Sequence, residues 1–198
     1  EKYLLTSPLE KTNEAYALAK IVGLKVCEFY NNQFNTNYFT LMPCNLYGPY
    51  DNFHIKNSHF IPALIKKFIE AKRKKKKHVE IWGSGLPKRE VMHVDDLADA
   101  IEYLLKLKIN NNKKLLQQIK HESLINIGSG QEFNIREFAE IINELTISKK
   151  KLRYNKKFPD GTMRKVLDIS TMNKLGWKSK INLRDGLRSA INWYKSNY

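Results

Sequence analysis

The stretch NEAYALAKIVGLKVCEFY, residues 13–30, decides how the rest of the chain is interpreted. Its apolar residues recur at helical spacing, which predicts a helix from Thr12 or Asn13, as N-cap, to residue 31 or 32. Tyr16 and Lys20 are four residues apart, so a helix places both side chains on one face. An adjacent ammonium favours the phenolate and makes the phenol a better acid. The same spacing also fits two ordinary surface neighbours, so the pair alone leaves catalysis open.

The segments after this helix alternate between strand and helix patterns. Short apolar runs predict strands at residues 38–42, 79–82, 90–94, 124–127 and 152–154, and a short extended segment at 166–168. Residues 43–53 are expected to form a loop, and residues 109–123 a mobile insertion. Helices are predicted from residue 58, over 97–107, 134–145 and 183–193, and from a cap at Ser170 and Thr171 to about Gly176. This alternation is typical of an α/β fold.

Composition narrows the classes of protein. The 198 residues are 42% hydrophobic, as expected for a globular chain, and no apolar run reaches the ~20 residues of a membrane span. The N-terminal residues lack the pattern of a signal peptide. Two cysteines, Cys27 and Cys44, form no disulfide framework, and their spacing predicts no metal site, which favours a reducing, intracellular setting.

The net charge of +15 is compatible with two kinds of partner. A basic surface can attract nucleic acid, but it serves an anionic small molecule equally well. Many of the lysines lie in short runs, at residues 72–77 and 149–151, and such runs usually occupy solvated loops or helix ends. Charge alone therefore does not identify the partner. No membrane partner is expected, because no apolar run is long enough for a span, and nucleic acid is expected less than an anionic small molecule.

The order of the motifs carries a family resemblance. Y-x-x-x-K at 16–20 is followed by P-x-N-L-Y-G-P at 43–49, W-G-S-G-x-P-x-R-E at 82–90 and H-V-D-D-L-A-D-A at 93–100. This series resembles the extended short-chain dehydrogenases/reductases that act on nucleotide sugars. Within that group, residues 45–54, 57–65 and 159–168 resemble the GDP-L-fucose synthase family. The resemblance runs from about residue 5 to 194, interrupted near residues 109–123.

The resemblance implies a Rossmann-type NADP-binding domain and a smaller substrate domain. The first comprises residues 1–47 and 93–130, and the second comprises 48–92 and 131–198. It also implies a cytoplasmic homodimer that associates through a bundle containing the helix of residues 13–30. The implied activity is NADP-dependent 3,5-epimerisation and 4-reduction of GDP-4-keto-6-deoxy-D-mannose to GDP-L-fucose.

Roles in catalysis and cofactor binding follow from the same resemblance. Tyr16 matches the proton donor in carbonyl reduction, and Lys20 matches the residue that binds the cofactor ribose and lowers the tyrosine pKa. His59 matches an acid/base that also borders the cofactor. The residues matched to the nicotinamide end of NADP are Pro43, Cys44, Asn45 and Leu46.

Four further residues match positions that hold the GDP-sugar, namely Lys67, Trp82, Arg89 and Asp160. Lys67 replaces the family's usual arginine, which keeps the charge but loses the bidentate fork. Each position also has a simpler explanation: a capping or surface histidine at His59, a core Trp82, a surface Arg89 and a turn-forming Asp160. His93 is expected to pack before its helix.

Parts of the family pattern are missing from these residues. The glycine-rich dinucleotide motif does not occur, and the family's catalytic serine and cysteine acid/base precede the tyrosine. Neither Cys27 nor Cys44 matches that cysteine. We therefore expect the chain to be an incomplete, inactive portion of the enzyme. The alternatives are another extended reductase or epimerase of nucleotide sugars, and a basic binding protein that keeps the fold without catalysis.

Overall fold

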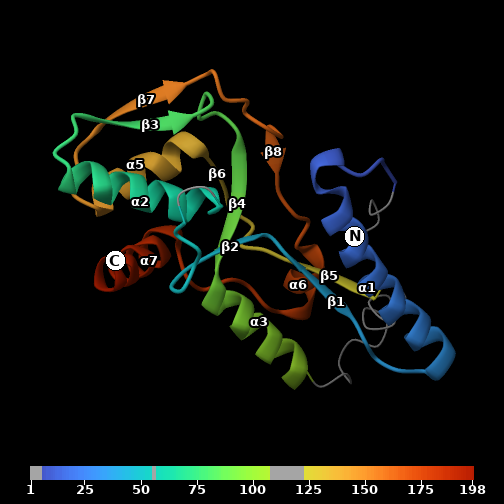
Figure 1. The fold of residues 1–198 in the computed structure, drawn as a ribbon. Coiled ribbons are helices and arrows are strands. Elements are labelled where there is room, and N and C mark those ends of the chain that lie inside the picture. Colours follow the sequence, from blue (N-terminus) through green and yellow to red (C-terminus); the bar gives the residue numbers. More distant parts are fainter. Residues whose placement is uncertain (1–5, 55–56, 108–122) are drawn as a thin grey trace.

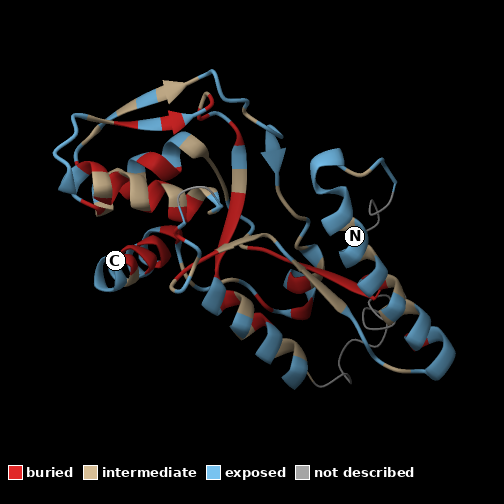
Figure 2. Ribbon diagram, viewed as in Figure 1, coloured by how far each residue is buried: buried red, intermediate tan, exposed pale blue. Residues whose placement is uncertain are grey.

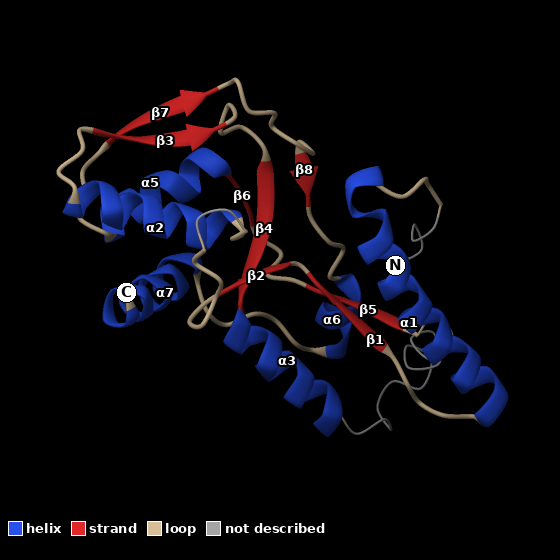
Figure 3. Ribbon diagram, viewed as in Figure 1, coloured by secondary structure: helices blue, strands red, loops and turns tan. Residues whose placement is uncertain are grey.

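The computed structural model describes residues 6–54, 57–107 and 123–198. Its helices are α1 (Glu14–Phe34), α2 (Phe60–Arg73), α3 (Val94–Lys106), α5 (Ile135–Leu145), α6 (Ser170–Leu175) and α7 (Leu183–Asn197), with a 3₁₀ turn at Lys11–Asn13. The strands are β1 (Thr40–Pro43), β2 (Asn45–Tyr47), β3 (His78–Trp82), β4 (Lys88–His93), β5 (Leu124–Ile127), β6 (Glu132–Asn134), β7 (Lys151–Asn155) and β8 (Arg164–Lys165) (Figures 1 and 3).

Strand β4 connects the two ends of the molecule. Its second half pairs in parallel with β2, while its first half pairs antiparallel with β6 and in parallel with β8. Strands β1 and β5 form a separate parallel pair at one end, and β3 and β7 form another at the opposite end (Figure 3). Mixed helices and parallel strands confirm the predicted α/β class.

Two apolar clusters lie on either side of β4. The larger one packs α2, α5 and α7 beneath β3, with Ile65, Phe68, Phe138 and Leu187 fully buried. The smaller one joins β5, α3 and α6, and includes Met92, Ile127 and Trp177. Figure 2 shows the buried residues concentrated on these facing surfaces. The division into two domains at the predicted boundaries stays a prediction.

Helix α1 runs two or three residues beyond its predicted end, to Phe34, and it leaves most of its apolar side chains in solvent. Only Leu24 and Asn31 of this helix are buried. The exposed apolar residues are Tyr16, Leu18, Val22, Val26, Phe29, Tyr30 and Phe34. Asn13 is the N-cap, as expected, but its side chain makes no capping bond; the carboxylate of Glu10 caps the preceding 3₁₀ turn instead.

Several local expectations are corrected. Strand β2 lies in the segment predicted as loop, and β6 ends at Asn134, where a helix was predicted to begin. Three-residue strands carry too little periodicity to be recognised. The extended pairing near residue 166 occurs earlier, at β8. Ser170 and Thr171 do not cap α6; the backbone N–H of Ser170 donates to the Asp168 carboxylate, and Ile169 is the N-cap. The expected insertion at 109–123 lies outside the described residues, except for the buried Ser123.

Candidate active site

A cavity of about 270 Å³ opens beside β2, β4 and the start of α2. It brings together four of the residues selected from the sequence, Asn45, Leu46, His59 and Arg89. They come from three separate elements, so their convergence is produced by the fold. The remaining lining residues are Phe60, Ile61, Val91, Thr162 and Lys165.

His59 occupies the N-cap position of α2, yet its side chain makes no capping hydrogen bond. The imidazole is exposed at the mouth of the cavity. The capping half of the simpler explanation is therefore wrong, whereas its surface half agrees with the exposed ring. An exposed imidazole that lines a cavity can contact a bound molecule.

Arg89 projects from β4 toward the segment of residues 158–165, which we call the strap. Its Nη1 donates to the carbonyl of Thr162 at 2.6 Å and to that of Lys88 at 2.8 Å. Partial burial lowers the pKa of the guanidinium, which nevertheless stays charged at neutral pH. Arg89 is thus a cavity residue that also fastens the strap, and not a free surface charge.

Asp160 fastens the other end of the strap to the turn after β3. Its Oδ1 accepts the backbone N–H of Ser84 at 2.6 Å, and this hydrogen bond is the main reason that the pKa of the carboxyl is lowered. Gly83 is required beside it, because a Cβ there would lie 2.3 Å from Asp160 Oδ1. Asp160 therefore holds a turn, as the simpler explanation supposed, while lying next to the predicted substrate residues.

Trp82 and Lys67 form a second cluster next to the strap. Trp82 is 55% exposed, so the expectation of a core tryptophan is wrong. The ring of Phe158 stacks on it, with centroids 4.5 Å apart and planes 15° apart. The Lys67 ammonium lies 4.4 Å from the Trp82 ring centroid and donates to the Glu80 carbonyl; burial lowers the pKa of this lysine.

Tyr16 and Lys20 lie on α1 and do not line the cavity. The Lys20 ammonium is 5.4 Å from the centroid of the Tyr16 ring, and Tyr16 is 67% exposed. The structure therefore keeps the two side chains adjacent, as helical spacing requires. It also leaves the phenol and ammonium accessible to a ligand.

Pro43 ends β1 and Cys44 connects it to β2, and both residues lie outside the lining of the cavity. Pro43 is exposed, whereas Cys44 is half-buried against the smaller apolar cluster. Burial, assisted by the negative charge of Glu90, raises the pKa of the Cys44 thiol to about 12. The predicted cofactor segment 43–46 is thus divided, with only its second half at the cavity.

Glu90 is a buried carboxylate that holds two loops together. Its Oε1 accepts the N–H of Gly130 and its Oε2 accepts the N–H of Leu167, both at 2.8 Å. A Cβ at Gly128 would lie 2.1 Å from Glu90 Oε1, so only glycine fits there. Glu90 follows Arg89 in β4, and the alternation of the strand directs the two side chains to opposite faces.

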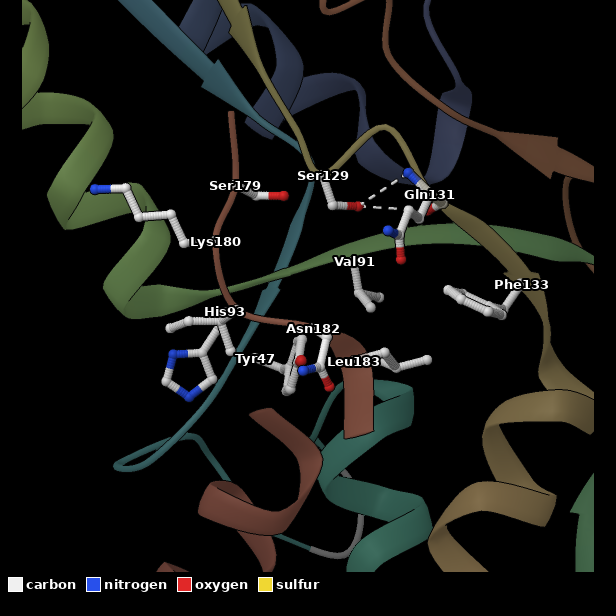
Figure 4. Close-up of a pocket in the computed structure, with 11 residues that line it drawn as sticks. Tyr47, Val91, His93, Ser129, Gln131, Phe133, Ser179, Lys180, Asn182 and Leu183 are labelled. Carbon is white, nitrogen blue, oxygen red and sulfur yellow. Dashed lines mark hydrogen bonds between the residues drawn. The ribbon is translucent and has the colours of Figure 1, made fainter. Parts of the chain in front are cut away.

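A smaller hollow of about 100 Å³ lies on the other side of Val91 (Figure 4). His93 borders it, buried, with its Nδ1 accepting the N–H of Asp95 at the start of α3. Its ring meets that of Tyr47 edge-on at 5.5 Å. The expectation that His93 packs before the helix is confirmed.

Comparison with known proteins identifies the family. Residues 1–128 match the NAD dependent epimerase/dehydratase family. The chain belongs to this family. Its α/β architecture is therefore that of the Rossmann-type epimerase/dehydratase fold, as the motifs had predicted.

Two relatives show which members of the family this chain is similar to. This epimerase/dehydratase chain is 47% identical over 197 residues to GDP-L-fucose synthase 1 of Arabidopsis thaliana, covering 100% of the chain and 58% of the relative. It is 42% identical over 195 residues to GDP-L-colitose synthase of Yersinia pseudotuberculosis, covering 98% and 60%. These names confirm the resemblance to GDP-L-fucose synthases. The chain spans less than two thirds of either relative.

A solved structure supports the assignment to the epimerase/dehydratase family. GDP-mannoheptose C4 reductase of Campylobacter jejuni, with NADP bound, superposes with a TM-score of 0.83 at 35% identity, covering 98% of this chain and 63% of that one. NADP is thus the cofactor of a near structural relative within the epimerase/dehydratase fold. Its substrate name differs from those of the other relatives.

Sequence reasoning missed two polar residues that line the epimerase/dehydratase cavity, Thr162 and Lys165, and a third, Asp51, that interacts with His59. Thr162 and Lys165 line the cavity from the strap, and only the fold shows that β8 lies against β4. Asp51 is close enough to His59 for an electrostatic interaction, although burial raises the pKa of its carboxyl overall. The motif at residues 159–168 was the available signal for the strap, and the motif at residues 45–54 contains Asp51, but neither motif assigned these three residues a role.

Proposed function

We propose that the protein to which this chain belongs catalyses NADP-dependent 3,5-epimerisation and 4-reduction of GDP-4-keto-6-deoxy-D-mannose to GDP-L-fucose. The observation that carries this proposal is the convergence of His59, Asn45 and Arg89 on one cavity. The exposed Trp82 and Lys67 lie beyond the strap that Arg89 fastens. An acid/base next to cationic and aromatic groups suits a sugar joined to a nucleoside diphosphate.

The chemistry begins with the acidity of the sugar. A ketone at C4 acidifies the protons on C3 and C5, so an acid/base can invert both centres through an enolate. His59 is assigned this exchange of protons, because its imidazole is exposed and lines the cavity. Asp51 is close enough to His59 for an electrostatic interaction.

Reduction of the C4 ketone uses Tyr16 and Lys20, the pair of side chains on α1. Tyr16 donates the proton to the C4 oxygen, and the ammonium of Lys20 stabilises the phenolate that remains. NADPH supplies the hydride when bound. The exposed phenol and ammonium fit this cofactor, because both can donate hydrogen bonds to ribose hydroxyls. Asn45 and Leu46 border the reacting end, with Pro43 and Cys44 behind them.

The nucleotide is held by the second cluster. Lys67 and Arg89 provide positive charge for the diphosphate, and the exposed Trp82 provides a stacking surface for the base. Asp160 accepts hydrogen bonds from the ligand with its remaining lone pairs, since Oδ1 already accepts from Ser84.

We also propose a cytoplasmic homodimer in which the exposed apolar face of α1 is covered by the second copy. Within the described residues no helix is long and apolar enough to cross a membrane. The second candidate function is a related conversion of another GDP-sugar, which the colitose and heptose names of the relatives favour.

A His59→Gln variant of the full-length protein tests the assignment. We expect the wild type to exchange solvent deuterium into C3 and C5 and then to oxidise NADPH, whereas the variant loses exchange. Unchanged inversion at C3 and C5 in the variant contradicts the role of His59. A wild type that reduces other 4-keto GDP-sugars without any exchange favours the second candidate. Absence of all NADPH-dependent activity favours a non-catalytic protein.

A further inference from the structure

Two lysine runs that are far apart in sequence meet at one end of the fold. Residues 72–77 end α2 and lead into β3, and residues 149–151 lead into β7. The backbone N–H of Lys151 donates to the Lys77 carbonyl at 3.3 Å, and the Lys72 ammonium donates to the Thr146 carbonyl at 3.2 Å. The fold therefore gathers nine cationic residues at the amino ends of two paired strands (Figure 1).

These charges face solvent and have few partners. Lys72 and Arg73 donate to the backbone carbonyls of Thr146 and Tyr198, and Lys74 donates to the Glu70 carboxylate. All of residues 72–77 are exposed, as are Lys149 and Lys151. Within the described part of the chain, Lys74 alone among them forms an ion pair with a carboxylate, that of Glu70. The nearby Glu144 is paired with Arg184 instead. This end of the molecule thus carries a concentrated, uncompensated positive charge.

An aliphatic side chain is displayed among the lysines. Ile147, in the turn between α5 and β7, is 64% exposed, although its neighbours Thr146 and Ser148 are buried. Its φ of 52° places a β-branched residue in the left-handed region, a conformation that such residues rarely adopt. Backbone strain at an exposed residue is maintained only where the surroundings enforce it, and it often marks a functional position.

The surroundings do enforce this turn. Asn143 Oδ1 accepts from the Ser148 hydroxyl at 2.5 Å and from the Lys150 N–H at 2.9 Å, while its Nδ2 donates to the Lys150 carbonyl at 2.9 Å. The Thr146 hydroxyl donates to the Ile142 carbonyl at 2.7 Å. Ile147 is therefore held outward by a preformed turn.

We propose that this basic tip, consisting of Ile147 with residues 72–77 and 149–151, docks on an anionic lipid bilayer. Lysines near a bilayer are attracted to acidic headgroups, and an aliphatic side chain gains by entering the interface. Nucleic acid would bind the lysines through its phosphates, but an exposed isoleucine would contribute nothing to that contact. The bilayer is the partner that accounts for both features.

Docking by the tip leaves the candidate active site accessible. The tip lies at the amino ends of β3 and β7, whereas Trp82 and Asn155 end these strands at the strap side (Figure 1). The sequence-based expectation of no membrane partner depended on the absence of a spanning segment. A reversible surface contact does not need one.

Co-sedimentation with phosphatidylcholine vesicles, with and without phosphatidylserine, tests the proposal. We expect the chain to bind only the phosphatidylserine vesicles, and more weakly as salt is added. Replacing Lys75, Lys76 and Lys149 by Gln should weaken binding at least tenfold. Ile147→Asn should weaken it severalfold without loss of folding, because Asn tolerates the left-handed region.

A matched control removes the same charge elsewhere. Replacing the exposed Lys106, Lys174 and Lys178 by Gln should leave vesicle binding nearly unchanged. The proposal is overturned if the wild type ignores phosphatidylserine, or if this control weakens binding as much as the tip variant does. Tighter binding to a fluorescent oligo-dT strand, insensitive to Ile147→Asn, would overturn it in favour of nucleic acid.

Discussion

The ammonium nitrogen of Lys67 lies 4.4 Å from the centroid of the Trp82 ring. The same indole stacks with Phe158, so its position is set from α2 on one hand and from the strap on the other. An exposed tryptophan would otherwise sample several rotamers. This arrangement orders the ring before any ligand arrives, which lowers the entropy cost of binding.

Trp82→Ala should therefore raise the KM for the GDP-sugar by about 10- to 100-fold, because stacking of a base on an aromatic ring contributes about 1–3 kcal/mol. The kcat should change little, since the indole lies away from His59. Steady-state kinetics of the full-length protein measure both constants. Trp82→Phe is the control and should retain most of the affinity. An unchanged KM in the alanine variant would remove Trp82 from the substrate site.

Lys67→Arg should lower the KM severalfold. Arginine can bind a phosphate with two parallel hydrogen bonds, whereas lysine acts as a single point charge. Lys67→Met, which keeps the stem without the charge, should raise the KM by at least tenfold. The ratio of the KM values of the two variants reports the contribution of the charge. Equal KM values in both variants would argue against a phosphate contact.

Arg89→Lys should loosen the strap. The substitution keeps the charge but cannot reproduce the two bonds to the carbonyls of Thr162 and Lys88. We expect a loss of about 1 kcal/mol in the free energy of unfolding. Limited proteolysis should cut faster within residues 158–165, and urea unfolding should give the energy. Unaltered cleavage in the strap would show that Arg89 does not restrain it.

Cys44 should make stability depend on pH in the alkaline range. Its folded pKa is raised to about 12, against about 8.5 for an unfolded cysteine. A raised folded pKa gives stability that is complete below pH 8.5 and is lost as pH rises toward 12. From pH 8 to 10 the wild type should therefore lose about 2 kcal/mol more than Cys44→Ala. Urea unfolding of both proteins at the two pH values measures this difference, and parallel losses would contradict it.

Long amphipathic elements could be predicted from the sequence because their periodicity is local. Helices α2, α3, α5 and α7 agree with expectation to within a few residues. Strands β2 and β6 could not, since their three residues become strands only by pairing with β4, far away in the chain.

The residues of the candidate site also fall into two groups, those predicted from the sequence and those placed there only by the fold. Asn45, Leu46, His59 and Arg89 belong to motifs, and the cavity unites them. Thr162 and Lys165 lie within the motif of residues 159–168, but only the pairing of β8 with β4 places them at the cavity. The sequence left Trp82 either in the core or at the substrate, and the position of β3 at the edge of the core leaves it in solvent.

The fit of Gly128 against Glu90 has a consequence for reading genetic variation in this protein. Any side chain at position 128 would collide with a carboxylate that already holds two loops. Mutational scans should therefore score position 128 as harshly as a residue that touches substrate. That intolerance would come from the lack of space for a side chain. A damaging allele at this glycine should therefore lower the amount of folded protein in the cell, while the specific activity of the molecules that do fold stays intact.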